Sequence, residues 1–115
     1  MPTVLIADDS AVVRLTLSSR LRASGVTVIE AGSMSAALRV DITAIDAALL
    51  DIDLGDGDGV TVAEALRAQR ADLPLAFFSS ETNEPIFSRA ASLATIFSKG
   101  AVSEAVAWAL TATSR

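Results

Sequence analysis

Short apolar runs alternate with segments of helical periodicity along the whole chain of 115 residues. These runs are rich in Val, Ile, Leu, Ala and Phe and hold few charges, which is typical of strands buried on both faces of a parallel sheet. The expected strands are Thr3–Ala7, Val26–Glu30, Ala47–Leu50, Leu75–Phe78 and Thr95–Phe97. This alternation limits the chain to folds in which helices cover a central sheet.

A helical segment follows each expected strand. Ser10 is a suitable N-cap for the first segment, and Gly25 closes it. The expected helices cover residues 11–23, 33–40, 60–70, 85–93 and 101–112, and 85–93 carries the weakest signal. The pattern predicts an α/β fold, a doubly wound five-stranded parallel sheet with about five helices. No linker or repeat interrupts it, so residues 1–115 are expected to form a single domain.

The composition narrows the classes of function. A hydrophobic content of 51% is typical of a compact domain, and the net charge of −5 argues against direct nucleic-acid binding. No apolar stretch approaches the roughly 20 residues that span a bilayer, and no secretory signal is visible. The chain has no cysteine and no histidine, which excludes disulfides, thiolate or imidazole metal sites and a phosphohistidine within it. We therefore expect a cytoplasmic protein without membrane contact.

Polar residues follow four of the five expected strands. They are Asp8 and Asp9, then Asp51, then Ser79 and Ser80, and finally Lys99. The carboxyl ends of parallel strands meet along one edge of a sheet, where open α/β sheets bind ligands. Three carboxylates, a hydroxyl and an ammonium at that edge suit a divalent metal and a phosphoryl group.

Lys99 is the only lysine, and the other eight basic residues are arginines. An ammonium is a compact point charge, whereas a guanidinium is a broad planar fork. A tight pocket for one phosphoryl oxygen would require the lysine. Taken alone, a strand-end surface lysine would be the simpler explanation.

Each polar group also has an ordinary explanation. Asp8, Asp9 and Ser10 could cap a helix, and Ser79 with Ser80 could bond to local backbone. The aspartates between residues 51 and 58 could form a polar turn. Asp51 differs from the others because it adjoins the apolar strand, where an uncompensated charge is costly.

Taken together, these residues resemble the receiver (CheY-like) domain of two-component response regulators, over nearly the whole chain, which implies a flavodoxin-like (CheY-like) fold. The matching positions are the acidic pair Asp8–Asp9, Asp51 at the end of the third strand, Asp58–Gly59, Ser79, and Lys99. The resemblance implies a phosphoacceptor domain that takes a phosphoryl group on Asp51 from a sensor histidine kinase or phosphotransfer protein and changes conformation to signal. Such a domain is no enzyme beyond its own phosphorylation and dephosphorylation.

The resemblance also implies a role for each site residue. Asp9, Asp51 and the backbone carbonyl of Asp53 would hold Mg²⁺, and Asp8 would act mainly through metal-bound water. Asp51 would be the nucleophile, and Lys99 with the Ser79 hydroxyl would bind phosphoryl oxygens. Asp53, Glu81 and Ser80 are expected to modulate the lifetime of the phosphoryl group.

Several positions depart from the family pattern. Gly100 replaces a common proline after the lysine, and Gly55 replaces a frequent proline in the loop after Asp51. Ile96 occupies the usual position of a switch aromatic, and Ser80 stands where alanine is common. We therefore expect intact chemistry and an altered means of transmitting it, without an aromatic rotamer switch.

Three other functions share parts of this sequence pattern. Asp51-x-Asp53 resembles the nucleophile motif of haloacid-dehalogenase-type phosphatases, but that motif normally ends the first strand. A degenerate receiver that acts only by protein binding is disfavoured because every residue needed for the chemistry is present. A Ca²⁺ loop fails because Gly55 and Val60 fall at ligand positions.

Trp108, the only tryptophan, is expected in the last helix. A helical wheel places Val102, Val106, Ala109 and Thr113 on the face toward the sheet. Trp108 falls off that face, beside Ala101, Ala105 and Ala112, and should be partly exposed. It could be a flanking core residue, or it could anchor a homodimer or a downstream partner.

Overall fold

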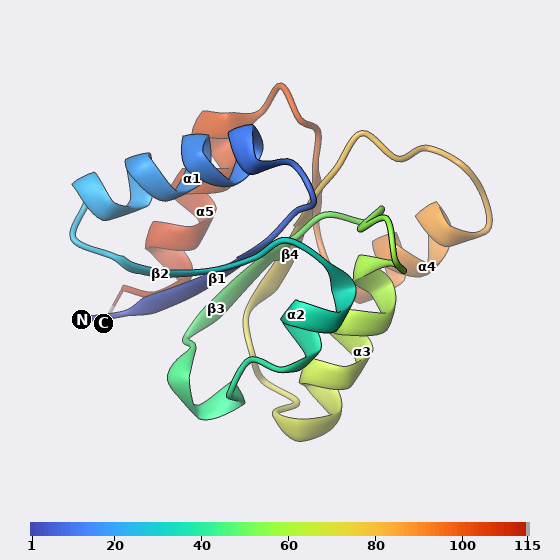
Figure 1. The fold of residues 1–115 in the computed structure, drawn as a ribbon, viewed down its shortest axis with the longest axis horizontal. Coiled ribbons are helices and arrows are strands. Elements are labelled where there is room, and N and C mark those ends of the chain that lie inside the picture. Colours follow the sequence, from blue (N-terminus) through green and yellow to red (C-terminus); the bar gives the residue numbers. More distant parts are fainter. Residues whose placement is uncertain (115) are drawn as a thin grey trace.

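The computed structural model describes residues 1–114 as an alternation of strands and helices (Figure 1). The strands are β1 (Thr3–Ala7), β2 (Thr27–Ala31), β3 (Ala47–Leu50), β4 (Leu75–Phe78) and β5 (Ile96–Phe97). The helices are α1 (Ala11–Ala23), α2 (Met34–Leu38), α3 (Gly59–Gln69), α4 (Ile86–Leu93) and α5 (Val102–Ala112), with a 3₁₀ helix at Ile42–Ala44. The predicted α/β class is confirmed.

All strand pairs are parallel, and the order across the sheet is β2-β1-β3-β4-β5. Helices α1 and α5 cover one face, while α2, α3 and α4 cover the other (Figure 1). The chain passes from β1 to β2 on one side and then crosses to β3 on the other side. The order of the strands therefore reverses between β1 and β3, and ligands bind beside the carboxyl ends of strands at such a reversal.

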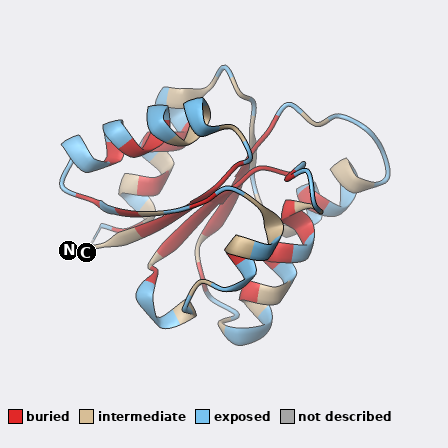
Figure 2. Ribbon diagram, viewed as in Figure 1, coloured by how far each residue is buried: buried red, intermediate tan, exposed pale blue. Residues whose placement is uncertain are grey.

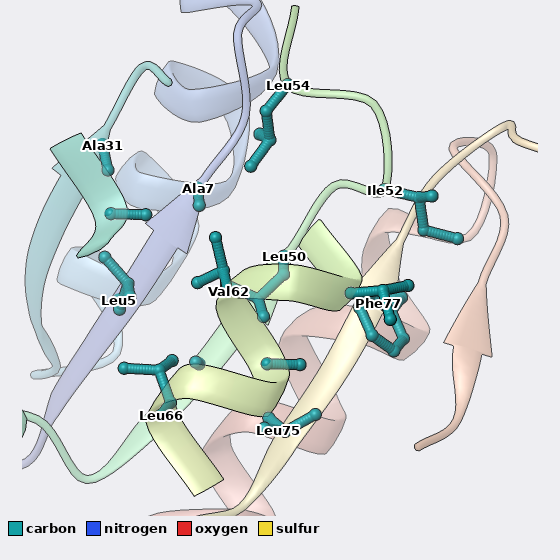
Figure 3. Close-up of a cluster of buried hydrophobic side chains, with 14 of the residues drawn as sticks. Leu5, Ala7, Ala31, Leu50, Ile52, Leu54, Val62, Leu66, Leu75 and Phe77 are labelled. Atoms are coloured by element: carbon teal, nitrogen blue, oxygen red, sulfur yellow. The ribbon is translucent and has the colours of Figure 1, made fainter. Parts of the chain in front are cut away.

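Side chains of each strand alternate between two buried cores. Leu5, Leu50 and Phe77 belong to the first core, which also includes Val62 and Leu66 of α3 (Figure 3). The second core lies between the sheet and helices α1 and α5, and burial is concentrated in the sheet between these layers (Figure 2). Continuous apolar strands result because both faces of the sheet are covered.

The largest differences from the predicted boundaries surround β2 and α2. Val26 belongs to the turn after α1, because its backbone N–H donates to the Leu21 carbonyl at 3.0 Å. Helix α2 ends at Leu38 instead of residue 40, and the last turn tightens as the Val40 N–H donates to Ala37. A 3₁₀ helix that was not predicted follows, and it begins where the Asp41 carboxylate accepts the Thr43 N–H at 2.9 Å.

Helix α5 corrects one part of the helical-wheel prediction. Ala105 is fully buried in the second core, although it was expected beside Trp108 away from the sheet. Trp108 itself is half-buried and packs against that core, so its predicted partial exposure is confirmed. The apolar face of α5 is wider than predicted because α1 packs against α5 as well as the sheet does.

Ser18 in α1 is fully buried, and its hydroxyl has no hydrogen-bond partner within the described part of the chain. A buried unsatisfied hydroxyl costs free energy that an apolar side chain of similar size does not. We expect Ser18→Ala to raise the free energy of unfolding by about 1 kcal/mol, measured by urea denaturation. The neighbouring exposed Ser19→Ala is the control and should change little. A clear loss of stability in Ser18→Ala would instead indicate a buried water bound to the hydroxyl.

Among residues 1–114, no helix combines the length and the apolar character needed to cross a lipid bilayer.

Candidate functional site

The carboxyl ends of β1, β3, β4 and β5 border one open cavity of about 370 Å³. All the predicted catalytic, metal-binding and modulating side chains line it. Its lining is Asp8, Asp9, Ser10, Asp51, Asp53, Ser79, Ser80, Glu81, Thr82, Asn83 and Lys99. Ile96, the predicted switch position, lies outside it.

Three carboxylates form the acidic part of this cavity. Asp8, Asp9 and Asp51 each offer an oxygen atom, and these atoms lie within 4.8 Å of one another. Asp8 and Asp51 are buried, while Asp9 is exposed. A set of clustered oxygen donors, partly open to water, suits a hard cation such as Mg²⁺, which keeps several waters.

The Lys99 ammonium lies between two of these carboxylates. Its Nζ makes an ion pair with Asp8 Oδ2 and contacts Asp51 Oδ2 at 3.2 Å. It also lies 5.3 Å from the centre of the Phe78 ring, within the range of a cation–π interaction. Lys99 therefore offsets part of the negative charge of the two buried carboxylates, Asp8 and Asp51.

The loop after β3 holds Asp51 by its backbone. The Asp51 N–H donates to the Ala7 carbonyl at 2.8 Å, which continues the pairing of β1 and β3 past the strand ends. Gly59 packs against the Asp51 carbonyl so closely that a Cβ atom there would overlap it. Asp58 begins α3 by accepting the Thr61 N–H at 2.7 Å. Asp58 and Gly59 thus shape the loop and need not touch a ligand.

Asp56, in the same loop, connects the loop to the first turn of α2. The Asp56 carboxylate accepts the N–H groups of Met34 at 2.7 Å and Ser35 at 3.1 Å. These two bonds lower the pKa of the Asp56 carboxyl group. Asp56 was expected to be only a turn residue, and its contact with α2 could not be read from a local pattern.

Ser79 and Glu81 are set by the turn after β4. The Ser79 N–H donates to the Phe97 carbonyl at 2.9 Å, and its Oγ accepts the Glu81 N–H at 3.1 Å. The Glu81 carboxylate accepts the Asn83 N–H at 2.7 Å and is only partly exposed. Asp53, on the far side of the cavity, is exposed, and its carboxylate accepts the Gly55 N–H at 3.0 Å.

Ile96 is half-buried against the first core and borders a second, more apolar cavity of about 510 Å³. Ser79 and Lys99 line both cavities, so the two share a wall. Phe87 of α4 also lines the second cavity. Sequence reasoning missed this aromatic residue because it considered ring positions only on β5.

Burial raises the pKa of the Asp51 carboxyl group above its usual value of 3.8. The Ser79 hydroxyl and the Lys99 ammonium oppose that shift, while the charge of Asp8 adds to it. Because the folded state has the higher pKa, the contribution of Asp51 to stability is fully present below pH 3.8. It is lost as the pH rises through the folded-state pKa.

At pH 7 the ionised Asp51 therefore destabilises the metal-free fold. We expect Asp51→Asn to raise the free energy of unfolding in EDTA by on the order of 1 kcal/mol. The gain should shrink as the pH falls through the raised pKa of Asp51, since this side chain then takes up a proton and is uncharged, as asparagine is. Urea denaturation of both proteins at several pH values measures it. A gain that stays constant with pH would show that it does not arise from the charge of Asp51.

A sequence profile of the response regulator receiver domain family matches residues 4–98 of this chain. The chain therefore belongs to this family, and its function is that of a receiver domain of two-component signal transduction. Receiver domains are signalling modules rather than classical enzymes, bind Mg²⁺ at an acidic cluster, and interact with histidine kinases or phosphotransfer proteins.

The chain is similar to the transcriptional regulatory protein PrrA of Mycobacterium leprae, with 40% identity over 83 residues. This alignment covers 71% of the chain but only 36% of PrrA. Among solved structures it resembles the non-phosphorylated HemR receiver domain from Leptospira biflexa, with a TM-score of 0.86 and 25% identity over 100% of this chain and 96% of that one. Chemotaxis protein CheY4 of Vibrio cholerae shares the fold, with a TM-score of 0.82, 24% identity and 98% of each chain covered.

Proposed function

We propose that this receiver domain accepts a phosphoryl group on Asp51 from a partner histidine kinase or phosphotransfer protein, in a reaction that requires Mg²⁺. One observation carries the proposal. Lys99 joins Asp8 to Asp51 beside the exposed Asp9, in a cavity open to a donor at the carboxyl end of the sheet. No single strand could supply this arrangement of charges.

In this proposal Asp9, Asp51 and the backbone carbonyl of Asp53 would hold the metal, and Asp8 would act through an intervening water. When bound, Mg²⁺ supplies the positive charge that lets an anionic phosphoryl group approach three carboxylates. A solved structure of response regulator TrrA from Thermotoga maritima in complex with Mg²⁺-BeF shares the fold, with a TM-score of 0.75 and 20% identity over 85% of this chain and 86% of that one.

The protein side chains then perform the transfer. An Asp51 oxygen attacks phosphorus and forms a P–O bond while the bond from phosphorus to the donor breaks. The Lys99 ammonium, 3.2 Å from Asp51 Oδ2, binds a phosphoryl oxygen of the product, and the Ser79 hydroxyl donates to another. Ser80, Asp53 and Glu81 border the approach to the phosphorylated carboxylate and modulate attack by water.

The proposal is tested by incubating the chain with acetyl phosphate and measuring the mass of the intact protein. We expect the addition of one phosphoryl group in Mg²⁺ and none in EDTA, with peptide mapping to Asp51. Addition that is equally fast in EDTA would contradict the role of the metal. Continuous release of phosphate from phosphate esters would instead favour the phosphatase alternative. Against that alternative, the Asp53 carboxylate already accepts a hydrogen bond from the Gly55 N–H of its own loop.

We propose that α5 provides a contact for a second copy or a downstream protein, anchored by the exposed part of Trp108. Trp108→Glu should leave phosphorylation of Asp51 intact and weaken self-association or partner binding, as measured by sedimentation with and without beryllofluoride. Unchanged sedimentation profiles with unchanged partner binding would show that Trp108 is a packing residue only.

Three expectations from the sequence stay predictions. They are the absence of direct nucleic-acid contact, a cytoplasmic location, and the assignment of residues 1–115 to one receiver domain.

A further inference from the structure

Arg14 of α1 extends its side chain to the ends of β1 and β2. Its Nη1 donates to the backbone carbonyl of Asp8 at 2.7 Å, and its Nε donates to Glu30 Oε1 at 3.3 Å. Gly32 leaves room for the guanidinium, since a Cβ atom there would lie 3.1 Å from Nη1. The Arg14 side chain is only 21% exposed, so these are partly desolvated, charge-assisted hydrogen bonds.

The bond from Arg14 completes the fixation of Asp8. The Asp8 N–H donates to the Ala31 carbonyl at 3.0 Å, Oδ1 accepts the Ser10 N–H at 2.9 Å, and Oδ2 pairs with Lys99. Arg14 holds the remaining polar atom, the carbonyl oxygen. That atom belongs to the peptide group that joins Asp8 to Asp9.

Asp9 is held very differently. Its side chain is exposed, and its carboxylate makes no hydrogen bond or ion pair with the residues that the structure describes. Where that carboxylate can reach therefore depends on where the backbone before it places the Asp9 Cα atom. Because the Asp8 carbonyl lies in the plane of the Asp8–Asp9 peptide, a partner that fixes this carbonyl also fixes the start of Asp9.

We propose that Arg14 is a positioning residue of the metal site, which orients the Asp8–Asp9 peptide so that the Asp9 carboxylate faces Asp51. The inference rests on the proposed Mg²⁺ site. Arg14 does not touch the metal or the phosphoryl group, and it acts through Asp8. Residues that orient metal ligands commonly change metal affinity by ten- to a hundredfold when they are replaced.

The chain offers a matched control on the same helix. Arg22 contacts the same Glu30, at 3.6 Å, but is 52% exposed, and its contacts do not include Asp8. Arg14→Met and Arg22→Met thus remove the same charge and both loosen Glu30, while only the first frees the Asp8 carbonyl. Magnesium affinity is measured by calorimetric titration of the intact chain with MgCl₂, independently of phosphorylation.

We expect Arg14→Met to raise the Kd for Mg²⁺ roughly tenfold and Arg22→Met to change it less than about twofold. The phosphorylation rate of Arg14→Met with acetyl phosphate should return to the wild-type value at saturating Mg²⁺. A purely structural role for Arg14 would lower stability without this specific, metal-reversible defect. Equal affinities in wild type and Arg14→Met would overturn the inference, and so would equal losses in both variants.

Two further measurements keep the test decisive. Wild-type protein that binds no Mg²⁺ would refute the proposed function itself, which is a different result from equal affinities. If Arg14→Met does not fold, Arg14→Lys replaces it, because an ammonium lacks the fixed fork by which Nη1 donates to the Asp8 carbonyl while Nε donates to Glu30. Arg14→Lys should show an intermediate Kd and a changed ¹⁵N shift of the Asp9 amide, and a changed shift with a wild-type Kd would overturn the inference.

Discussion

Asp51→Asn is expected to abolish phosphorylation by acetyl phosphate, with a loss of more than about 100-fold. An amide oxygen carries no negative charge and is a far weaker nucleophile than a carboxylate oxygen. The change keeps the shape of the side chain, so Lys99 can still pair with Asp8 and the cavity should persist. Intact-mass measurement after incubation in Mg²⁺ detects the loss directly.

Asp53→Asn is the matched control for this prediction. Asp53 lies two residues further along the same loop, is exposed, and would serve the metal through its backbone carbonyl, which the change leaves in place. This variant should still be phosphorylated on Asp51, with a changed lifetime of the product. If phosphorylation survives in Asp51→Asn, or is lost equally in both variants, the assignment of Asp51 as the acceptor is wrong.

Gly59→Ala is expected to lower the free energy of unfolding by about 3 kcal/mol and to impair phosphorylation as well. The new methyl group would overlap the backbone carbonyl of Asp51, and a backbone atom cannot move aside as a flexible side chain can. The hydrogen bond from the Gly59 N–H to the Ile52 carbonyl, 2.8 Å long, opposes separation of the two segments. Relief of the clash would therefore displace Asp51 itself.

Gly100→Ala tests whether this effect is specific. A Cβ atom at Gly100 would meet nothing within 4 Å, so this variant should keep nearly wild-type stability. Urea denaturation and acetyl phosphate labelling of both variants compare the two sites. Similar small effects in Gly59→Ala would mean that the loop after β3 can shift without cost, and that Asp51 is less rigidly placed than the contacts indicate.

The strands and α1 were predictable because a buried parallel sheet requires continuous apolar runs, which are easily seen in the sequence. β1, β3, β4 and α1 have the predicted boundaries, since their apolar runs or their caps end abruptly in the sequence. Helix α2 depends on a contact with another part of the chain. Asp56 caps α2 from 21 or more residues away, and no local pattern reveals such a partner.

The same distinction applies to the site. The residues at the strand ends were predictable because parallel strands bring their carboxyl ends together, and all of them line one cavity. Arg14 was missed because its contacts with Asp8 and Glu30 depend on how α1 is placed against the sheet. The burial of Ala105 was missed for a related reason: one helical wheel cannot show that α1 and the sheet both cover α5.

Lys99 carries the only side-chain amine in the chain. Amine-selective reagents therefore report on one side chain of the functional site and on no other lysine. Its side chain is 25% exposed and is held by two carboxylates, so its reactivity should follow whatever competes for those contacts. A metal ion that binds the carboxylates would release the ammonium, and a phosphoryl group would engage it again. Acylation at this single position should thus be fastest in the metal-bound state and slower in the free and phosphorylated states, in which the ammonium is engaged.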